Sequence, residues 1–283
     1  MLLLFPFFTP LSIDIAGVDT PFDPQFNLSF VDIYTSPYLH IPWYPILGNH
    51  DYRKSLVAQI EYSLYNPYWI MKDTNYSIQY TLPSTLSSLP QVISTDNNPN
   101  TINTNNNHNC ISFIFIDTCP FIQEYYDPNH WDNYPQFGIN IKNSHPQALL
   151  LWLEEQLIKN YQQCIGSIVI GHHPIYTAGI HGDSQELVQQ FKPLFDKYGV
   201  DMYIAGHDHT MVHLRKDDID YIITGAGSRV RSNNIVTPET IWIGDVPGFT
   251  IHSMNSTHIL TSYIHANGDV IHQSFHPLRS KGF

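Results

Sequence analysis

Long hydrophobic runs, basic residues and cysteines are all scarce in this chain of 283 residues. No stretch reaches the roughly 18 apolar residues of a spanning helix, so we expect no membrane span. Lys and Arg number 13 against 25 Asp and Glu, which gives a formal net charge of -12. Nucleic acids and anionic membranes are bound by clustered basic residues, so neither is expected as a main partner. An anionic substrate would need a local positive centre, which metal ions can supply.

The three cysteines, Cys110, Cys119 and Cys164, have no CxxC or zinc-type spacing. One disulfide is possible, and one thiol would then remain. The cysteine count therefore does not settle the compartment. Three Asn-X-Ser/Thr sequons, at Asn27, Asn75 and Asn255, would accept glycans if the chain is secreted.

Hydrophobic residues make up 42% of the chain, which is typical of a globular protein with a packed core. The first two-thirds alternate apolar runs with helical periodicity, and the last third alternates apolar and polar residues as antiparallel strands do. We therefore predict an α/β domain over residues 17–283 with an Asn-rich loop insert at 84–109. Residues 1–16 stay unassigned, because the apolar start 1–8 resembles a signal peptide but lacks a basic region and a clear cleavage site.

Periodicity predicts the individual elements. Helices are expected at 22–34, 56–65, 146–161 and 185–198, and Pro193 should kink or split the last of them. The dipeptide Asn267–Gly268 predicts a type I′ turn between the last two strands. Strands are expected at 43–47, 76–80, 111–116, 167–170, 202–205, 221–223, 249–253, 258–264 and 270–275.

Three of the apolar runs end at a glycine that is followed at once by residues able to bind a metal. The motifs are Gly-Asn-His-Asp at 48–51, Gly-His-His-Pro at 171–174 and Gly-His-Asp-His at 206–209. Ligands bind at the carboxyl edge of open α/β sheets, so we expect these side chains to converge there. Alternation along an extended segment would place His207 and His209 on one side.

Amide and imidazole ligands suit iron, zinc or manganese better than calcium. Bound metals would neutralise an anionic group and lower the pKa of a coordinated water. An imidazole that is not a ligand could protonate a leaving group. The combination indicates metal-assisted hydrolysis of a phosphate ester.

The three motifs resemble the last three of the five metal motifs of the calcineurin-like metallophosphoesterases. Within that superfamily, the mammalian-type purple (tartrate-resistant) acid phosphatases are the most similar group. Ile-Pro-Trp-Tyr at 41–44, the stretch 171–181, Tyr-Gly-Val at 198–200 and Thr-Gly-Ala-Gly at 224–227 also match it. The resemblance implies a four-layer α/β/β/α sandwich. It also implies a binuclear centre, with Fe³⁺ beside Fe²⁺, Zn²⁺ or Mn²⁺.

Carried over residue by residue, the resemblance assigns a role to each motif. Asn49, His172 and His207 would hold the divalent metal, and His209 would belong to the iron(III) site. The two catalytic histidines would be His50 and His181, which would contact the phosphate and help to protonate the leaving group.

The chain departs from the family at its front. The family's Asp-x-Gly motif is absent, and Leu11 and Asp14 stand where its second motif has a bridging Asp and an iron-bound Tyr. We therefore expect the fold to lack the family's first strand and the iron(III) site to be incomplete. A wrongly joined or incomplete N-terminus would explain this contrast.

The resemblance predicts a secreted or lysosomal acid phosphatase, expected to be a monomer that acts on a small phosphorylated substrate. Two alternatives remain open. The first is that the chain is an inactive homologue kept as a binding or structural protein. The second is that it is a metallophosphoesterase that acts on diesters or nucleotides.

Overall fold

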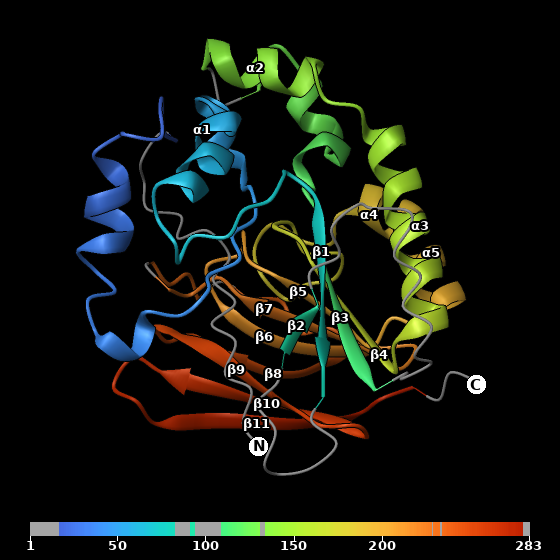
Figure 1. The fold of residues 1–283 in the computed structure, drawn as a ribbon. Helices are drawn as coiled ribbons and strands as arrows, with labels where there is room; N and C mark the ends of the chain where they lie inside the picture. Colours follow the sequence, from blue (N-terminus) through green and yellow to red (C-terminus); the bar gives the residue numbers. More distant parts are fainter. Residues whose placement is uncertain are drawn as a thin grey trace.

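The computed structural model describes residues 17–82, 91–93, 109–130, 134–227, 229–232 and 234–279. Two β-sheets form its centre, with one layer of helices beside the larger sheet and a helical N-terminal segment at one end (Figure 1). The predicted α/β sandwich class is confirmed.

The larger sheet has eight strands in the order β2-β1-β3-β4-β5-β7-β6-β8. β3, β4, β5 and β7 run parallel to one another, and the flanking pairs are antiparallel. The parallel strands are buried along their whole length, which explains why they read as continuous apolar runs. The strands are β1 Tyr76–Thr81, β2 Gln91–Ile93, β3 Cys110–Phe115, β4 Gly166–Ile170, β5 Met202–Ala205, β6 Met211–Lys216, β7 Ile219–Thr224 and β8 Thr240–Gly244.

Three helices lie together beside the larger sheet: α3 (Pro146–Gln163), α4 (Gln185–Gln190) and α5 (Lys192–Tyr198) (Figure 1). On α3, Leu153 and Leu157 are buried, and the helix contacts β3 and β4. α4 and α5 are the two halves of the helix predicted at 185–198. They divide where Pro193 removes an N–H, and α5 ends at Gly199, whose φ is +60°.

The smaller sheet has the order β11-β10-β9 and is the predicted meander: β9 Gly248–Met254, β10 His258–His265 and β11 Val270–Pro277. It packs on β6 and β7 of the larger sheet. The Tyr263 hydroxyl donates to the Val212 carbonyl across this interface at 3.1 Å.

The predicted type I′ turn at Asn267–Gly268 is wrong. Four residues separate β10 from β11, and of the two turn residues only Gly268 has a positive φ, +95°. A type I′ turn needs positive φ at both central residues. That condition is met instead between β6 and β7, where Asp217 and Asp218 have φ of +50° and +60°. Asp tolerates this region better than most residues, although it is a weaker signal than Asn-Gly.

The strand predicted at 43–47 is also wrong, because this buried segment forms only a single β-bridge, from Trp43 to Trp69. Pro42 and Pro45 have no N–H to donate to a ladder, so the apolar run lies in the core without regular pairing.

Short helical elements make up the rest. The helix predicted at 22–34 is shorter than expected, a π-helical turn at η1 (Asn27–Val31). It packs in a small cluster of its own with Phe26, Phe30, Trp43 and Tyr62. The helix predicted at 56–65 is α1 (Leu56–Glu61) followed by η4 (Tyr62–Leu64). The others are η2 Pro37–Leu39, η3 Asn49–Arg53, η5 Cys119–Phe121, η6 Gln123–Tyr126 and α2 Pro135–Lys142.

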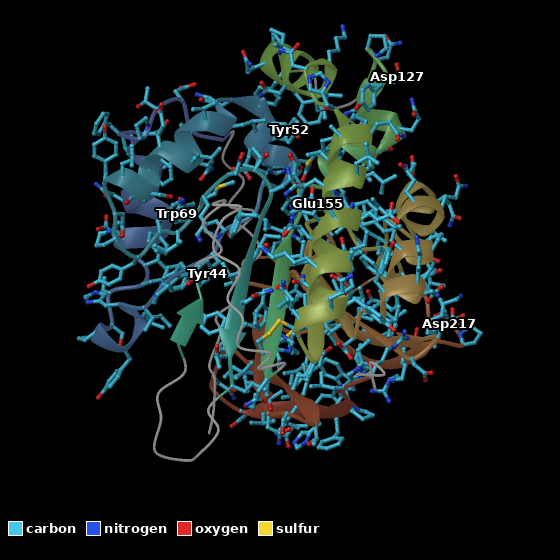
Figure 2. All side chains as sticks on the ribbon, turned by 45° about the vertical axis from the view of Figure 1, so that its right-hand side comes forward. Tyr44, Tyr52, Trp69, Asp127, Glu155 and Asp217 are labelled. Atoms are coloured by element: carbon cyan, nitrogen blue, oxygen red, sulfur yellow. A yellow bond between two sulfur atoms is a disulfide. The ribbon has the colours of Figure 1, made fainter. Side chains whose placement is uncertain are left out.

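A disulfide joins Cys110 at the start of β3 to Cys164 directly after α3, and Cys119 remains as a buried thiol (Figure 2). This matches the possibility left by the cysteine count. Most of the predicted insert at 84–109 and all of segment 1–16 lie outside the described residues. β2, which falls in the insert, was not predicted, and neither were β6 and β8.

Candidate metal centre

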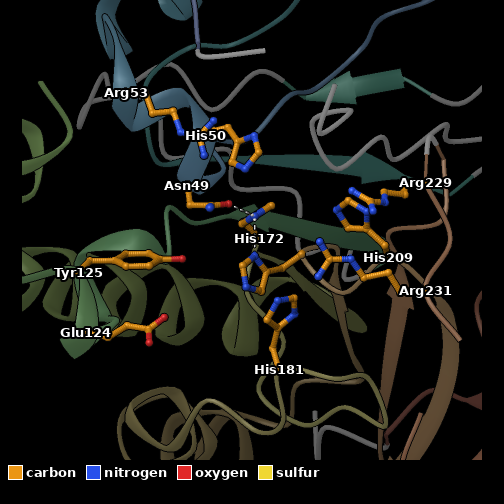
Figure 3. A pocket seen from close by; sticks show the side chains of 11 residues that line it. Asn49, His50, Arg53, Glu124, Tyr125, His172, His181, His209, Arg229 and Arg231 are labelled. Atoms are coloured by element: carbon orange, nitrogen blue, oxygen red, sulfur yellow. Dashed lines mark hydrogen bonds between the residues drawn. The ribbon is translucent and has the colours of Figure 1, made fainter. Parts of the chain in front are cut away.

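A cavity of about 370 Å³ opens where the three glycine motifs meet (Figure 3). All six predicted site residues line it, although they come from three distant parts of the sequence. The lining residues are Asn49, His50, Arg53, Glu124, Tyr125, His172, His181, His207, His209, Arg229 and Arg231.

Three of the predicted metal ligands converge on one point. The Asn49 Oδ1 lies 3.0 Å from the His172 Nε2, which in turn lies 3.2 Å from the His207 Nδ1. Two ligand atoms that each lie about 2.1 Å from one metal ion are separated by roughly 3.0–3.4 Å. One imidazole N–H could not donate to both neighbours, so this spacing suits a shared cation better than a hydrogen-bond chain.

Local structure fixes Asn49 at this point. Gly48 passes under the His172 ring so closely that a Cβ there would lie 2.9 Å from it. After Gly48 the chain turns into η3, and the Asp51 carboxylate accepts hydrogen bonds from the Gly48 N–H at 2.8 Å and from Gln59 of α1 at 2.8 Å. Burial raises the pKa of Asp51 to about 6, although both hydrogen bonds oppose this.

Burial also controls the protonation of the candidate ligands. It lowers the pKa of His172 to about 3, helped by repulsion from His50, His209 and His181. Burial lowers the pKa of His207 well below its ordinary value too. Both imidazoles therefore stay neutral at mildly acidic pH, which is the form that binds a metal.

His173 is part of the same histidine cluster, since one of its ring nitrogens lies within 4.8 Å of a ring nitrogen of His172 and of one of His207. Both of its nitrogens already have partners. Nδ1 lies 2.8 Å from the Thr118 hydroxyl, and Nε2 lies 2.7 Å from the Tyr125 hydroxyl. Because both of its ring nitrogens are engaged by hydroxyl groups, His173 is a poorer third metal ligand than Asn49.

The Gly-His-Asp-His segment is not extended, contrary to the alternation argument. His207 has a φ of +61°, a conformation that costs about 1 kcal/mol or more for a residue with a Cβ. This turn sends the His207 ring into the cluster and the Asp208 side chain into the protein. His209 still lines the cavity, next to Arg229 (Figure 3).

The buried Asp208 carboxylate pairs with the exposed His181 ring. The Asp208 Oδ1 lies 2.5 Å from the His181 Nδ1, and its Oδ2 accepts from the Thr177 hydroxyl at 2.6 Å. Burial alone would raise the pKa of Asp208, but the hydrogen bonds from His181 and Thr177 outweigh it and lower the pKa. The carboxylate fixes the His181 ring so that its Nε2 is available to the cavity.

The sequence does not single out several residues that shape the site. Asp208 stands in the sequence as the spacer of a histidine motif, and its pairing with His181 depends on a loop 27 residues away. Arg53, Arg229, Arg231 and Tyr125 carry no motif of their own. Leu11 and Asp14, which stand where the family has further ligands, lie outside the described residues.

The fold and this site define a metallophosphoesterase. A family model for the calcineurin-like phosphoesterases matches residues 18–211, and the chain belongs to that family. It is 31% identical to purple acid phosphatase 17 of Arabidopsis thaliana over 83% of this chain. It is 26% identical to human tartrate-resistant acid phosphatase type 5 over 94% of this chain. The alignments span 59% and 76% of those two proteins.

The same fold occurs in GAP50, described as the anchor in the inner membrane complex of Plasmodium. That structure superposes with a TM-score of 0.74 at 23% identity, over 95% of this chain and 76% of the other. Family membership implies a dinuclear metal centre, for which the described residues provide a partial histidine cluster. None of the described helices is long and apolar enough to cross a membrane.

Proposed function

We propose that this chain hydrolyses phosphate monoesters at acidic pH with a metal held by Asn49, His172 and His207. The observation that carries the proposal is the convergence of these three ligand atoms beside the His181–Asp208 pair. Fe²⁺, Zn²⁺ or Mn²⁺ suits such a donor set. When bound, the metal neutralises phosphate charge and activates a water.

The two remaining histidines would bind the phosphate group and protonate the leaving group. His50 lies at the start of η3 next to Asn49, and it would contact the phosphate oxygens. His181 would give the proton on its Nε2 to the departing alcohol, while its Nδ1 proton stays with Asp208. Acidic conditions suit the metal ligands, because burial keeps His172 and His207 neutral there.

Turnover of p-nitrophenyl phosphate between pH 4 and 8, after loading with each metal, tests the proposal. His172→Ala should abolish both metal uptake and turnover, whereas His145→Ala, at the start of α3 outside the cavity, should change neither. Metal uptake without turnover would favour the alternative of an inactive binding or structural protein. Faster hydrolysis of bis(p-nitrophenyl) phosphate than of the monoester would favour a diesterase.

We infer a secreted or lysosomal location from the disulfide between Cys110 and Cys164, because such bonds persist in oxidising compartments. Of the three sequons, Asn27 and Asn255 are exposed and open to glycosylation. Asn75 is half-buried, and its Oδ1 accepts from the Asp117 N–H at 2.8 Å. Glycan mapping after expression in a secretory host should therefore find the first two occupied.

A further inference from the structure

The cavity is positively charged although the chain is acidic. Three arginines line it, against a single carboxylate among its described lining residues, in a chain of net charge -12. Guanidinium groups keep their charge at every physiological pH and match the oxygen geometry of phosphate. This local reversal of sign indicates an anionic ligand.

Two of the arginines flank His209. Arg229 and Arg231 follow β7 on a loop that carries both side chains toward the cavity, and Arg231 extends toward its centre (Figure 3). The carboxylate, Glu124, lies on the opposite wall (Figure 3). Neither Arg229 nor Arg231 forms an ion pair with another described residue. Their charge is thus not neutralised by a carboxylate of that part of the chain.

The loop that bears these arginines is fixed by backbone hydrogen bonds. The Arg231 N–H donates to the His209 carbonyl at 2.8 Å, and the Gly225 N–H donates to the Thr210 carbonyl at 3.2 Å. The Ile235 N–H donates to the Ala178 carbonyl at 2.7 Å, close to the segment that carries His181. The backbone that carries the two arginines is therefore held beside the candidate metal site.

A second cation fits poorly on this side of the cavity. Of the described lining residues, His209 is the one ligand there, and guanidinium groups beside it repel a cation. The same charges attract a phosphate dianion. We propose that Arg229 and Arg231 form a phosphate-binding subsite beside His209. The two guanidinium groups supply positive charge there in place of a second metal ion, and the subsite binds phosphate without any metal.

This inference rests on the proposed function only in taking the same cavity as the phosphate site. Its test is binding without turnover. The full chain is stripped with a chelator, and its affinity for inorganic phosphate is measured by calorimetry. The metal-free protein should bind phosphate, and Arg231→Gln should weaken binding about 10-fold, with a larger loss in the Arg229→Gln/Arg231→Gln double variant.

Two further variants sharpen the result. Arg231→Lys should retain more affinity than Arg231→Gln, because lysine keeps the positive charge although it lacks the paired N–H donors of a guanidinium group. Lys142→Gln, an exposed charge on α2 outside the cavity lining, should bind as the wild type does. Circular dichroism checks that each variant is folded.

The inference is overturned if the metal-free wild type binds no phosphate, or if the double variant binds it as well as the wild type does. A lysine variant that restores no affinity would also contradict it. Failure of the proposed function would give a different pattern of results. In that case metal-loaded protein would not turn over p-nitrophenyl phosphate, while metal-free binding would still depend on the two arginines.

Discussion

The Nδ1 of His181 lies 2.5 Å from the Oδ1 of Asp208, and the two groups differ sharply in exposure. The Asp208 side chain is 1% exposed and that of His181 is 39% exposed. The buried carboxylate therefore aligns a ring whose other nitrogen reaches the cavity. Gly179 leaves space for the Asp208 carboxylate, since a Cβ at that position would overlap it.

Replacing Asp208 by Asn should lower kcat on alkyl phosphates about 10- to 100-fold, because a neutral amide lacks the negative charge that pairs with the His181 ring and can turn its NH2 toward that ring. The loss should be smaller on p-nitrophenyl phosphate, whose leaving group needs little protonation. Kinetics on the two substrates measure this difference. The double variant with His181→Asn should be no slower than His181→Asn alone, since the two residues act as a unit. Additive losses would contradict the pairing.

A methyl group at Gly48 should weaken metal binding. The Cβ of Gly48→Ala would lie 2.9 Å from the His172 ring, so the ring would be displaced from Asn49 and His207. We expect at least about a 10-fold loss of metal affinity, the lower end of what a displaced ligand costs. Gly138→Ala on α2 is the matched control, because a Cβ there meets nothing within 4 Å. Metal titration of both variants measures the difference, and equal affinities would contradict the prediction.

The sequence predicts strands well where burial is continuous. β3, β4 and β5 and the closing meander were all predicted, because their apolar runs or alternation leave little choice of period. β6 was missed. Its last two residues are Arg215 and Lys216, and these charged residues interrupt the alternation that would identify a strand. The Arg215 guanidinium pairs with Asp220 on β7, a contact that only the fold reveals.

The residues of the candidate site likewise fall into those that the sequence predicts and those that it does not. Asn49, His172 and His207 are recognisable because each follows a glycine at the end of an apolar run. Arg231 is not, because an arginine in a polar loop looks like any surface residue. Its position in the cavity depends on a hydrogen bond to His209, which the chain order does not indicate. Whether the six predicted residues act as assigned stays a prediction.

The ionisation of Asp117 should lower the stability of the metal-free protein as the pH rises from about 4 to 7, whereas the lowered pKa values of His172 and His207 act in the opposite direction. Burial raises the pKa of Asp117 to about 7, against the hydrogen bonds that its carboxylate accepts from Tyr52 at 2.5 Å and from the Cys119 N–H at 3.0 Å. In the unfolded chain the pKa of an Asp is about 3.9. The folded state therefore binds more protons between these values, and its advantage, fully present below pH 4, is lost as the pH approaches 7.

Three pH units correspond to about 4 kcal/mol, and we expect on the order of half of that from this group. Asp117→Asn should remove this falling contribution and make the slope of stability against pH more positive, since an amide keeps an acceptor oxygen and cannot ionise. Thermal unfolding between pH 4.5 and 7.5 measures the slopes. Asp269→Asn, at the exposed turn before β11, is the control and should leave the slope unchanged. An identical slope in the Asp117 variant would contradict the prediction.

The disulfide should contribute measurably to stability. Cys110 and Cys164 are 54 residues apart in sequence, so the bond restricts a long loop of the unfolded chain that contains β3 and α3. Such a restriction is worth about 2–4 kcal/mol. The Cys110→Ser/Cys164→Ser double variant should lose about that much free energy of unfolding in denaturant titrations. A reducing agent should destabilise the wild type by a similar amount and leave this variant unchanged. Cys119→Ala, which removes the buried free thiol, should remain sensitive to the reducing agent, and an insensitive wild type would contradict the prediction.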